Sequence, residues 1–238
     1  MGAVHHTEKD GELVDYEILS RLPLFEGLDE ADKTALIDKM GQVTLRRSEI
    51  LFTEGDDGDR LFVVTEGKVK LGHASSDGRE NLLAVLGPGE MLGELTLFDP
   101  GPRSGTATAI APTTLVWLAH SDLMVFLETR PSMAKHFLRA LAMRLRKTNT
   151  TLADLVFSDV PGRVAKALLD LAERFGSKTP DGIHVPHDLT QEELAQLVGA
   201  SRETVNKSLA EFVSRGWIRL EGRAVTLIDI ERLMRRAR

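Results

Sequence analysis

The sequence predicts an α+β protein in which a compact β-roll or barrel is followed by one long helix and a smaller helical domain. Three observations predict this. Short β-type runs separated by Gly, Pro and Asp turns fill residues 50–118. Residues 132–157 contain no Gly or Pro and carry leucines at heptad spacing. The residues after 190 predict two short helices joined by a turn and followed by a hairpin.

Length and composition limit the class of protein. The 238 residues are enough for one or two domains, and none of them is cysteine. Disulfides, thiolate zinc sites, cysteine-ligated iron–sulfur clusters and cysteine nucleophiles are therefore excluded. No apolar run approaches the roughly 18 residues of a membrane span, and the start, residues 1–10, is not a signal peptide. We expect a cytoplasmic protein with no membrane partner and a loose tail over residues 1–17.

The net charge of −6 is unevenly distributed along the chain. Residues 1–161 hold 17 Lys and Arg against 25 Asp and Glu, a net charge of −8. Residues 162–238 hold 13 against 11, a net charge of +2. This change of sign suggests that the two parts have different partners, and that the second is the better candidate for binding a polyanion.

The first domain, predicted over residues 18–130, is β-rich. Leu61–Thr65 and Val69–Leu71 have strand-like composition and are separated by Glu66-Gly67-Lys68. The cluster Gly87-Pro88-Gly89 marks a further turn. Strands this short, without helices alternating between them, favour a β-roll or barrel over a parallel sheet.

A long helix is predicted over residues 131–157, about 39 Å long at 1.5 Å per residue for the part without Gly or Pro. Its seam has spacings of three and four residues: Leu138, Leu141, Leu145, Thr148, Leu152 and Leu155. Such a helix either packs along its own domain or pairs with a copy of itself, and the regular spacing favours a dimerisation helix. Thr148 is the polar member of the seam, a residue type that can set register or oligomeric state.

The predicted helix ends near Phe157, and residues 158–162 form the predicted hinge. Asp159 is a suitable cap for the next helix, with Pro161 in its first turn. The last domain is predicted over residues 163–238. Within it, Gly176–Asp188 has the composition of a loop.

A helix-turn-helix is predicted in this last domain. The sequence Thr190-Gln191-Glu192-Glu193 is a capping box that begins one helix. The residues Gly199-Ala200-Ser201 form a tight turn, and Ser201 caps a second helix whose apolar side is Val205, Leu209 and Phe212. The β-type runs Trp217–Leu220 and Ala224–Ile228 predict a wing hairpin.

The polar face of the second helix suits contacts in the DNA major groove. Arg202 can donate two hydrogen bonds to guanine, Glu203 can accept from cytosine, and Lys207 can donate to guanine without a fork. Arg219 and Arg223 of the wing are expected near phosphates. The alternative is a solvated charged face; the order of cap, turn, cap and wing favours DNA binding. The four arginines between residues 232 and 238 could add phosphate contacts. Basic residues also suit a helix C-terminus, and this second interpretation is favoured.

A possible ligand site lies between residues 92 and 106. Gly93 allows close backbone approach and a short helix that begins there, and Glu94 can accept from a sugar hydroxyl. Arg103 can donate two hydrogen bonds to a phosphate, and Ser104 adds a hydroxyl. These groups suit a nucleotide. From the residues alone, a surface ion pair between Glu94 and Arg103 remains the alternative.

These motifs resemble those of the Crp–Fnr family of transcription regulators, and particularly its cyclic-AMP-binding actinobacterial members. The resemblance runs from Ile18 to the C-terminus. It rests on residues 52–60 and Glu66–Leu71, on Gly93-Glu94-Leu95 through Pro102-Arg103-Ser104, and on Gly199–Val205. The fold that it implies is an N-terminal β-roll that binds a cyclic nucleotide, a dimerisation helix and a C-terminal winged helix-turn-helix.

The resemblance implies cyclic AMP as allosteric ligand, with no metal and no enzymatic activity. It implies that Glu94 holds the ribose 2′-hydroxyl and that Arg103 with Ser104 holds the phosphate, with Gly93 and Leu95 beside them. Thr148 and Asn149 would contact the adenine. It further implies a homodimer, a palindromic TGTGA-type site in double-stranded DNA, and RNA polymerase as a partner. The residues that it assigns to DNA are Thr190, Ser201, Arg202, Glu203, Thr204 and Lys207.

The chain departs from the best-known family pattern in a few positions. The spacing from Glu94 to Arg103 is one residue shorter, and Asn149 stands where Ser is common. Gln191 stands where relatives have a phosphate-contacting Arg, and Lys207 where Arg is common. Two alternatives remain open: a regulator of the same fold with no ligand or another ligand, and a cyclic-nucleotide-binding module that acts on a protein partner. Haem ligation by His73 is disfavoured, because the Glu94/Arg103 pair would have no purpose there.

Overall fold

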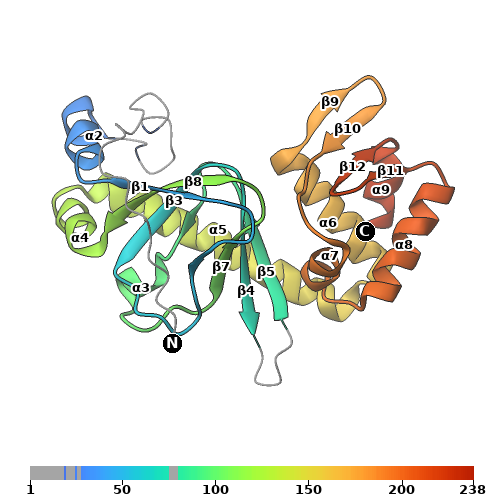
Figure 1. Cartoon of the computed structure of the whole chain (residues 1–238), viewed down its shortest axis with the longest axis horizontal. Helices are drawn as coiled ribbons and strands as arrows, with labels where there is room; N and C mark the ends of the chain where they lie inside the picture. Colours follow the sequence, from blue (N-terminus) through green and yellow to red (C-terminus); the bar gives the residue numbers. More distant parts are fainter. Residues whose placement is uncertain (1–18, 20–24, 26–27, 75–79) are drawn as a thin grey trace. The chain divides into compact units, whose positions relative to one another are not determined.

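The computed structural model describes the whole chain except residues 1–18, 20–24, 26–27 and 75–79 (Figure 1). The predicted loose tail lies outside the described residues. The chain divides into two compact units. The first comprises residues 1–73 and 84–144, and the second comprises residues 74–83 and 145–238.

The β-rich part of the chain contains two antiparallel four-stranded sheets, in the orders β1-β8-β3-β6 and β2-β7-β4-β5. The predicted strands over residues 61–65 and 69–71 are present and slightly longer. The strands are β1 (Gly41–Leu45), β2 (Ile50–Phe52), β3 (Arg60–Glu66), β4 (Val69–Ala74), β5 (Glu80–Leu86), β6 (Met91–Leu92), β7 (Thr106–Ala109) and β8 (Thr113–Ala119). The helices that accompany them are α2 (Glu30–Ile37), α3 (Leu95–Phe98), α4 (His120–Thr129) and α5 (Pro131–Phe157).

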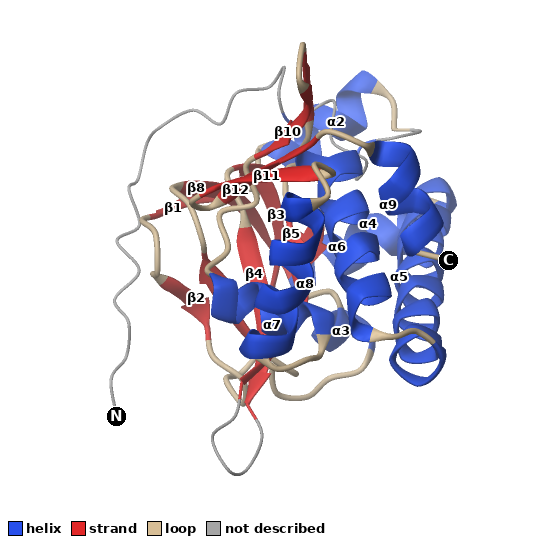
Figure 2. Ribbon diagram, turned by 90° about the vertical axis from the view of Figure 1, so that its right-hand side faces the viewer, coloured by secondary structure: helices blue, strands red, loops and turns tan. Residues whose placement is uncertain are grey.

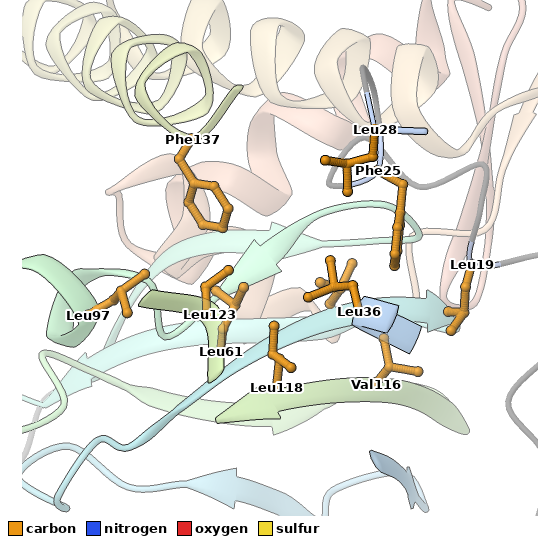
Figure 3. Packing of buried hydrophobic residues seen from close by; sticks show 11 residues of the cluster. Leu19, Phe25, Leu28, Leu36, Leu61, Leu97, Val116, Leu118, Leu123 and Phe137 are labelled. Atoms are coloured by element: carbon orange, nitrogen blue, oxygen red, sulfur yellow. The ribbon is translucent and has the colours of Figure 1, made fainter. Parts of the chain in front are cut away.

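Alternating apolar residues fill two cores in this part. One core packs residues of β3 and β8 against helices, and Figure 3 shows Phe137 pointing from α5 toward Leu123. The other core lies between strands and includes Val64, Val69 and Leu115. Burial of this apolar area is the main stabilising contribution to the β-roll. The predicted α+β class with a β-roll is confirmed.

Helix α5 runs without interruption from Pro131 to Phe157, the bounds that the sequence predicts. The boundary between the two units falls within it, after Arg144. Three leucines of the predicted seam, Leu138, Leu145 and Leu152, are each more than half exposed in the single chain. Such a row of exposed leucines is typical of a helix that pairs with another helix.

The second unit ends the chain with a helical domain that carries a small sheet of order β11-β12-β10-β9. Its helices α7 and α8 are adjacent (Figures 1 and 2). The elements are α6 (Val160–Phe175), β9 (Ser177–Thr179), β10 (Gly182–Val185), α7 (Gln191–Val198), α8 (Arg202–Ser214), β11 (Ile218–Glu221), β12 (Ala224–Leu227) and α9 (Ile230–Arg236).

The prediction of a loop over Gly176–Asp188 is wrong, because β9 and β10 lie there. Ile183 pairs with Leu227 and Val185 pairs with Val225 of the wing. The segment is therefore a strand because of its partner, whereas its local composition is typical of a loop.

The connection between α5 and α6 is shorter than the predicted hinge of residues 158–162. Helix α6 already begins at Val160, so only Ser158 and Asp159 separate the two helices. Asp159 caps α6 as predicted, since its side chain accepts a hydrogen bond of 3.0 Å from the backbone N–H of Gly162. Arg236 of α9 donates to the same carboxylate at 2.6 Å. The Arg236 guanidinium is the main cause that lowers the pKa of Asp159.

Candidate ligand pocket and nucleic-acid interface

A small pocket opens in the first unit where β6 leads into α3. Strands β2 and β4 and helix α5 each contribute one residue to its lining. The residues that line it are Phe52, Leu71, Gly93, Glu94, Leu95, Thr96, Arg103, Ser104, Gly105 and Arg144. Five of the seven residues predicted to bind a cyclic nucleotide thus lie together.

Glu94 is the buried acid of this pocket, with only 2% of its surface exposed. Its Oε1 atom pairs with Arg144 of α5. Its Oε2 atom is buried and has no hydrogen-bond partner among the described residues. The alternative of a Glu94–Arg103 surface ion pair is wrong, because both side chains are buried and each bonds elsewhere.

Arg103 is the buried base of the pocket, with 5% of its surface exposed. Its Nη1 atom donates to the Gly93 carbonyl at 3.2 Å, and its Nη2 atom donates to the Arg60 carbonyl at 2.8 Å. Its guanidinium lies 4.5 Å from the ring centroid of Phe52, a favourable cation–π distance. Burial lowers its pKa, an effect that nearby acids such as Asp59 oppose. An arginine stays positively charged at neutral pH even so.

Gly93 makes this arrangement possible. Its φ of +86° is unfavourable for residues with a Cβ atom. A Cβ atom built here would also lie 2.4 Å from Nη1 of Arg103 and 2.8 Å from the Arg60 carbonyl oxygen. Helix α3 begins at Leu95, two residues later than the sequence predicts.

The pocket offers one unused acceptor and one unused donor. Besides Glu94 Oε2, the Nε atom of Arg103 is buried and has no partner among the described residues. A buried polar atom without a partner is costly unless a ligand satisfies it. An acidic ligand group beside a hydroxyl-bearing group fits this pair, and the exposed side chain of Ser104 adds a hydroxyl at the rim.

Two residues predicted to bind the ligand lie outside the pocket, and one residue that was not predicted lines it. Thr148 and Asn149 are exposed on α5 and do not line the pocket in this chain. Arg144 lines it, although the sequence reasoning missed it. The signal that was available is its position four residues before Thr148, on the same face of the helix.

The predicted helix-turn-helix is formed by α7 and α8. The Thr190 hydroxyl accepts from the backbone N–H of Glu193 at 3.1 Å, and the Glu193 carboxylate accepts from the backbone N–H of Thr190 at 2.8 Å, so the capping box is complete. Ser201 caps α8 by accepting from the backbone N–H of Thr204 at 3.2 Å, and the two hydroxyls lie 2.8 Å apart. Two of the six predicted DNA-binding residues, Thr190 and Ser201, therefore also cap the starts of helices, and Thr204 bonds to the second cap.

The other three predicted DNA-binding residues, Arg202, Glu203 and Lys207, are exposed on α8. Within the described part of the chain, none of their side chains makes an ion pair or a hydrogen bond. Their neighbour Asn206 donates instead to the Oε1 atom of Gln191 at 3.1 Å, which links α8 to α7. The charged side chains at the start of α8 are thus available for contacts with bases in the DNA major groove, which come from this end of a recognition helix.

The basic residues further along the chain are mostly paired. Arg219 of the wing bonds to Glu221 and Asp181, so it is less available to a phosphate than predicted. In α9, Arg232, Arg235 and Arg236 pair with acidic side chains, which agrees with their interpretation as helix C-terminal residues. Arg223, at the tip of the wing, is exposed.

Two family models match the chain over these two sites. The cyclic nucleotide-binding domain matches residues 42–130, and the Crp-like helix-turn-helix domain matches residues 162–236. The chain is 53% identical over 222 residues to the CRP-like cAMP-activated global transcriptional regulator of Mycobacterium tuberculosis, covering 93% of this chain and 99% of that protein. The chain belongs to the Crp–Fnr family of transcription regulators.

Other Crp–Fnr proteins agree with this. The cyclic AMP receptor protein of Thermus thermophilus is 35% identical, over 83% of this chain and 88% of its own. The solved structure of the c-di-GMP responsive regulator CLP of Xanthomonas campestris is 26% identical, with a TM-score of 0.72 over 84% of this chain and 99% of that chain. The family consists of regulators and not of enzymes. Among the described helices, none is both long and apolar enough to cross a membrane.

Proposed function

We propose that the protein is a cyclic-AMP-responsive homodimeric transcription regulator that binds a palindromic TGTGA-type DNA site. The observation that carries the proposal is the buried acceptor of Glu94 beside the buried donor of Arg103, which together fit a sugar hydroxyl and a phosphate. Membership of the Crp–Fnr family supports it, because the Mycobacterium and Thermus relatives are named for cyclic AMP.

Each pocket residue has a distinct role in this proposal. Glu94 accepts from the ribose 2′-hydroxyl, while Arg103 and Ser104 donate to the cyclic phosphate. Gly93 and Leu95 shape the wall of the pocket. Thr148 and Asn149 contact the adenine from α5. Arg144 pairs with the Glu94 carboxylate and orients it toward the sugar.

Continuity of α5 couples the ligand to the DNA-binding domain. The same helix supplies Arg144 to the pocket and the exposed leucines that pair in the dimer. Only Ser158 and Asp159 separate it from α6. A ligand that prefers one arrangement of this helix tenfold shifts the equilibrium by about 1.4 kcal/mol.

The exposed start of α8 makes the base contacts. Arg202 contacts guanine, Glu203 contacts cytosine, and Lys207 contacts a second guanine without a fork. Thr190, Ser201 and Thr204 lie at the helix starts, where backbone N–H groups face phosphates. In a two-fold dimer the half-sites lie roughly 34 Å apart. RNA polymerase is the proposed partner at the promoter, and the cytoplasm is the proposed location.

DNA binding with and without ligand tests the proposal. Fluorescence anisotropy on a TGTGA palindrome at fixed salt should show tighter binding when cyclic AMP is added. Arg103→Ala should abolish calorimetric cyclic AMP binding, because the phosphate loses its buried charge. The matched control Arg46→Ala removes an arginine of the same unit that does not line the pocket. Unchanged cyclic AMP affinity in Arg103→Ala would contradict the assignment of the pocket.

A second ligand class is worth the same measurement. The Xanthomonas regulator of this fold is described as c-di-GMP responsive, so the fold alone does not select cyclic AMP. The single buried arginine of the pocket favours a ligand with one phosphate. Calorimetric titration with cyclic AMP, cyclic GMP and c-di-GMP should therefore give the tightest binding for cyclic AMP. A preference for c-di-GMP would reject the proposed ligand and leave the DNA-binding function intact.

A further inference from the structure

His120 lies next to the pocket and has no role in the function proposed above. It is the first residue of α4, directly after β8. Its ring is partly buried, and its Nε2 atom is buried with no hydrogen-bond partner in the described part of the chain. A buried ring nitrogen without a partner invites an explanation in terms of ligand binding or protonation.

His120 lies beside the start of β3, where its backbone N–H donates to the Asp59 carbonyl at 2.9 Å. The Gly93 and Arg60 carbonyls accept hydrogen bonds from the Arg103 guanidinium at 3.2 and 2.8 Å. The same two carbonyls favour the protonated form of the His120 imidazole and so oppose the lowering of its pKa. His120 and Arg103 therefore lie around the same part of the backbone, at the start of β3 and at Gly93.

The charged groups around His120 decide its protonation. Arg103 repels a proton on the ring and Asp59 attracts one. The Arg60 guanidinium lies 4.2 Å from the centroid of the Trp117 ring, and its Nε atom is 3.8 Å from Asp59. Asp122, on the same helix, pairs with Lys39 at 3.3 Å. Burial first, and then Arg103, lowers the pKa of His120, so the ring is neutral at pH 7 in the free protein.

We propose that His120 is a positioning residue of the anion site, and that it takes up a proton when an anionic ligand binds to Arg103. This inference rests on the proposed function of the pocket. An anion beside Arg103 cancels the repulsion that this guanidinium exerts on the ring. The carbonyls of Gly93 and Arg60 and the carboxylate of Asp59 then favour the imidazolium. Its N–H groups can donate to carbonyls that also accept from Arg103.

The sign of the pH dependence follows from linkage. In this proposal the pKa of His120 is higher in the complex than in the free protein. Ligand affinity therefore increases as the pH falls through the pKa of the complex, and it levels off below the pKa of the free protein. If the two values differ by one unit, the dissociation constant is about tenfold smaller at the acidic end. A cyclic phosphodiester keeps a single negative charge throughout this range.

Calorimetric titration of the full-length protein with cyclic AMP between pH 5.5 and 8 tests the inference. We expect affinity to rise toward acidic pH in the wild-type protein. Titrations at one pH in two buffers of different ionisation enthalpy should show proton uptake. In His120→Gln both effects should disappear, so that its affinity for cyclic AMP no longer changes between pH 5.5 and 8. The control His73→Gln replaces a histidine that pairs with Glu54 at 2.8 Å and should keep the wild-type pH profile.

The outcomes separate this inference from the proposed function. Binding with no pH dependence and no proton uptake in the wild-type protein overturns the role of His120, even if the His120→Gln protein does not fold. A pH profile unchanged in His120→Gln overturns it as well. Absence of cyclic AMP binding at every pH instead rejects the ligand proposed for the pocket.

Discussion

Glu94 and Arg103 are both buried in the first unit, although buried charges are costly without compensation. Arg144 pairs with one of them, and the Gly93 and Arg60 carbonyls accept from the other. Each still has one buried polar atom without a partner among the described residues. The free protein thus keeps two desolvated groups ready for a ligand, and ligand binding recovers part of their desolvation cost.

At α8, Arg202→Ala should weaken binding to the cognate DNA site by about 1–3 kcal/mol and reduce specificity at one guanine, because a bidentate base contact is lost. Anisotropy on the cognate site and on single-base variants measures both effects. Arg215→Ala is the control, since that side chain already bonds to Glu211 at 2.9 Å. An equal loss on every sequence would instead identify Arg202 as a phosphate contact.

From the residues alone Glu94 and Arg103 could bind a nucleotide or form a surface ion pair, and the family resemblance favoured the first; both line one pocket. Sequence reasoning missed Arg144, whose partner is 50 residues away in the chain. Such a pairing depends on how α5 packs beside β6 and α3, and local patterns carry no information about that. His120 was missed for the same reason, since its environment comes from β3, Gly93 and Arg103.

Among the elements, helix ends were predicted best. The caps at Asp159, Thr190 and Ser201 all form as expected, because a cap is decided by residues within one turn. The strands β9 and β10 were not predicted, because three or four residues have too little pattern to indicate a strand. Pairing with β12 provides the hydrogen bonds that define β10.

The capping box of α7 leads to a stability prediction. Thr190→Ala should lower the free energy of unfolding of the second unit by about 0.5–2 kcal/mol, because two hydrogen bonds at the helix start are lost. Thr190→Ser keeps the hydroxyl and should stay within a few tenths of the wild type. Urea denaturation followed by circular dichroism measures both variants. Equal losses in the two variants would mean that the methyl group, and not the cap, is responsible.

For the molecule as a whole, the net charge of −6 conceals an acidic part and a weakly basic part. The charges at the start of α8 are free while those of α9 are paired, so placement and not total charge provides the attraction for DNA. Regional charge predicted which part binds DNA. It could not predict which arginines are available, because ion pairs such as Arg219–Asp181 join segments far apart in the sequence.

The polar member of the leucine seam tests how dimerisation and ligand response are connected. Thr148→Ala should reduce the cyclic-AMP-dependent gain in DNA affinity more than it reduces dimerisation, since it removes a proposed adenine contact from an otherwise apolar row. Leu152→Ala is the matched control and should weaken dimerisation first. Sedimentation measures the dimer and anisotropy measures the response. If Thr148→Ala only dissociates the dimer, Thr148 sets register instead.

Because α5 is uninterrupted, the number of residues between two positions fixes the rotation of one relative to the other about the helix axis. Each residue of an α-helix turns the chain by 100° and advances it by about 1.5 Å. From Arg144 to Phe157 there are 13 residue steps in one helix, so each residue inserted there would rotate the direction of the chain that follows by 100°. Seven inserted residues would return that direction to within about 20°, whereas two would turn it to the opposite side of the helix. The length of this part of α5 can therefore change by seven residues far more easily than by two.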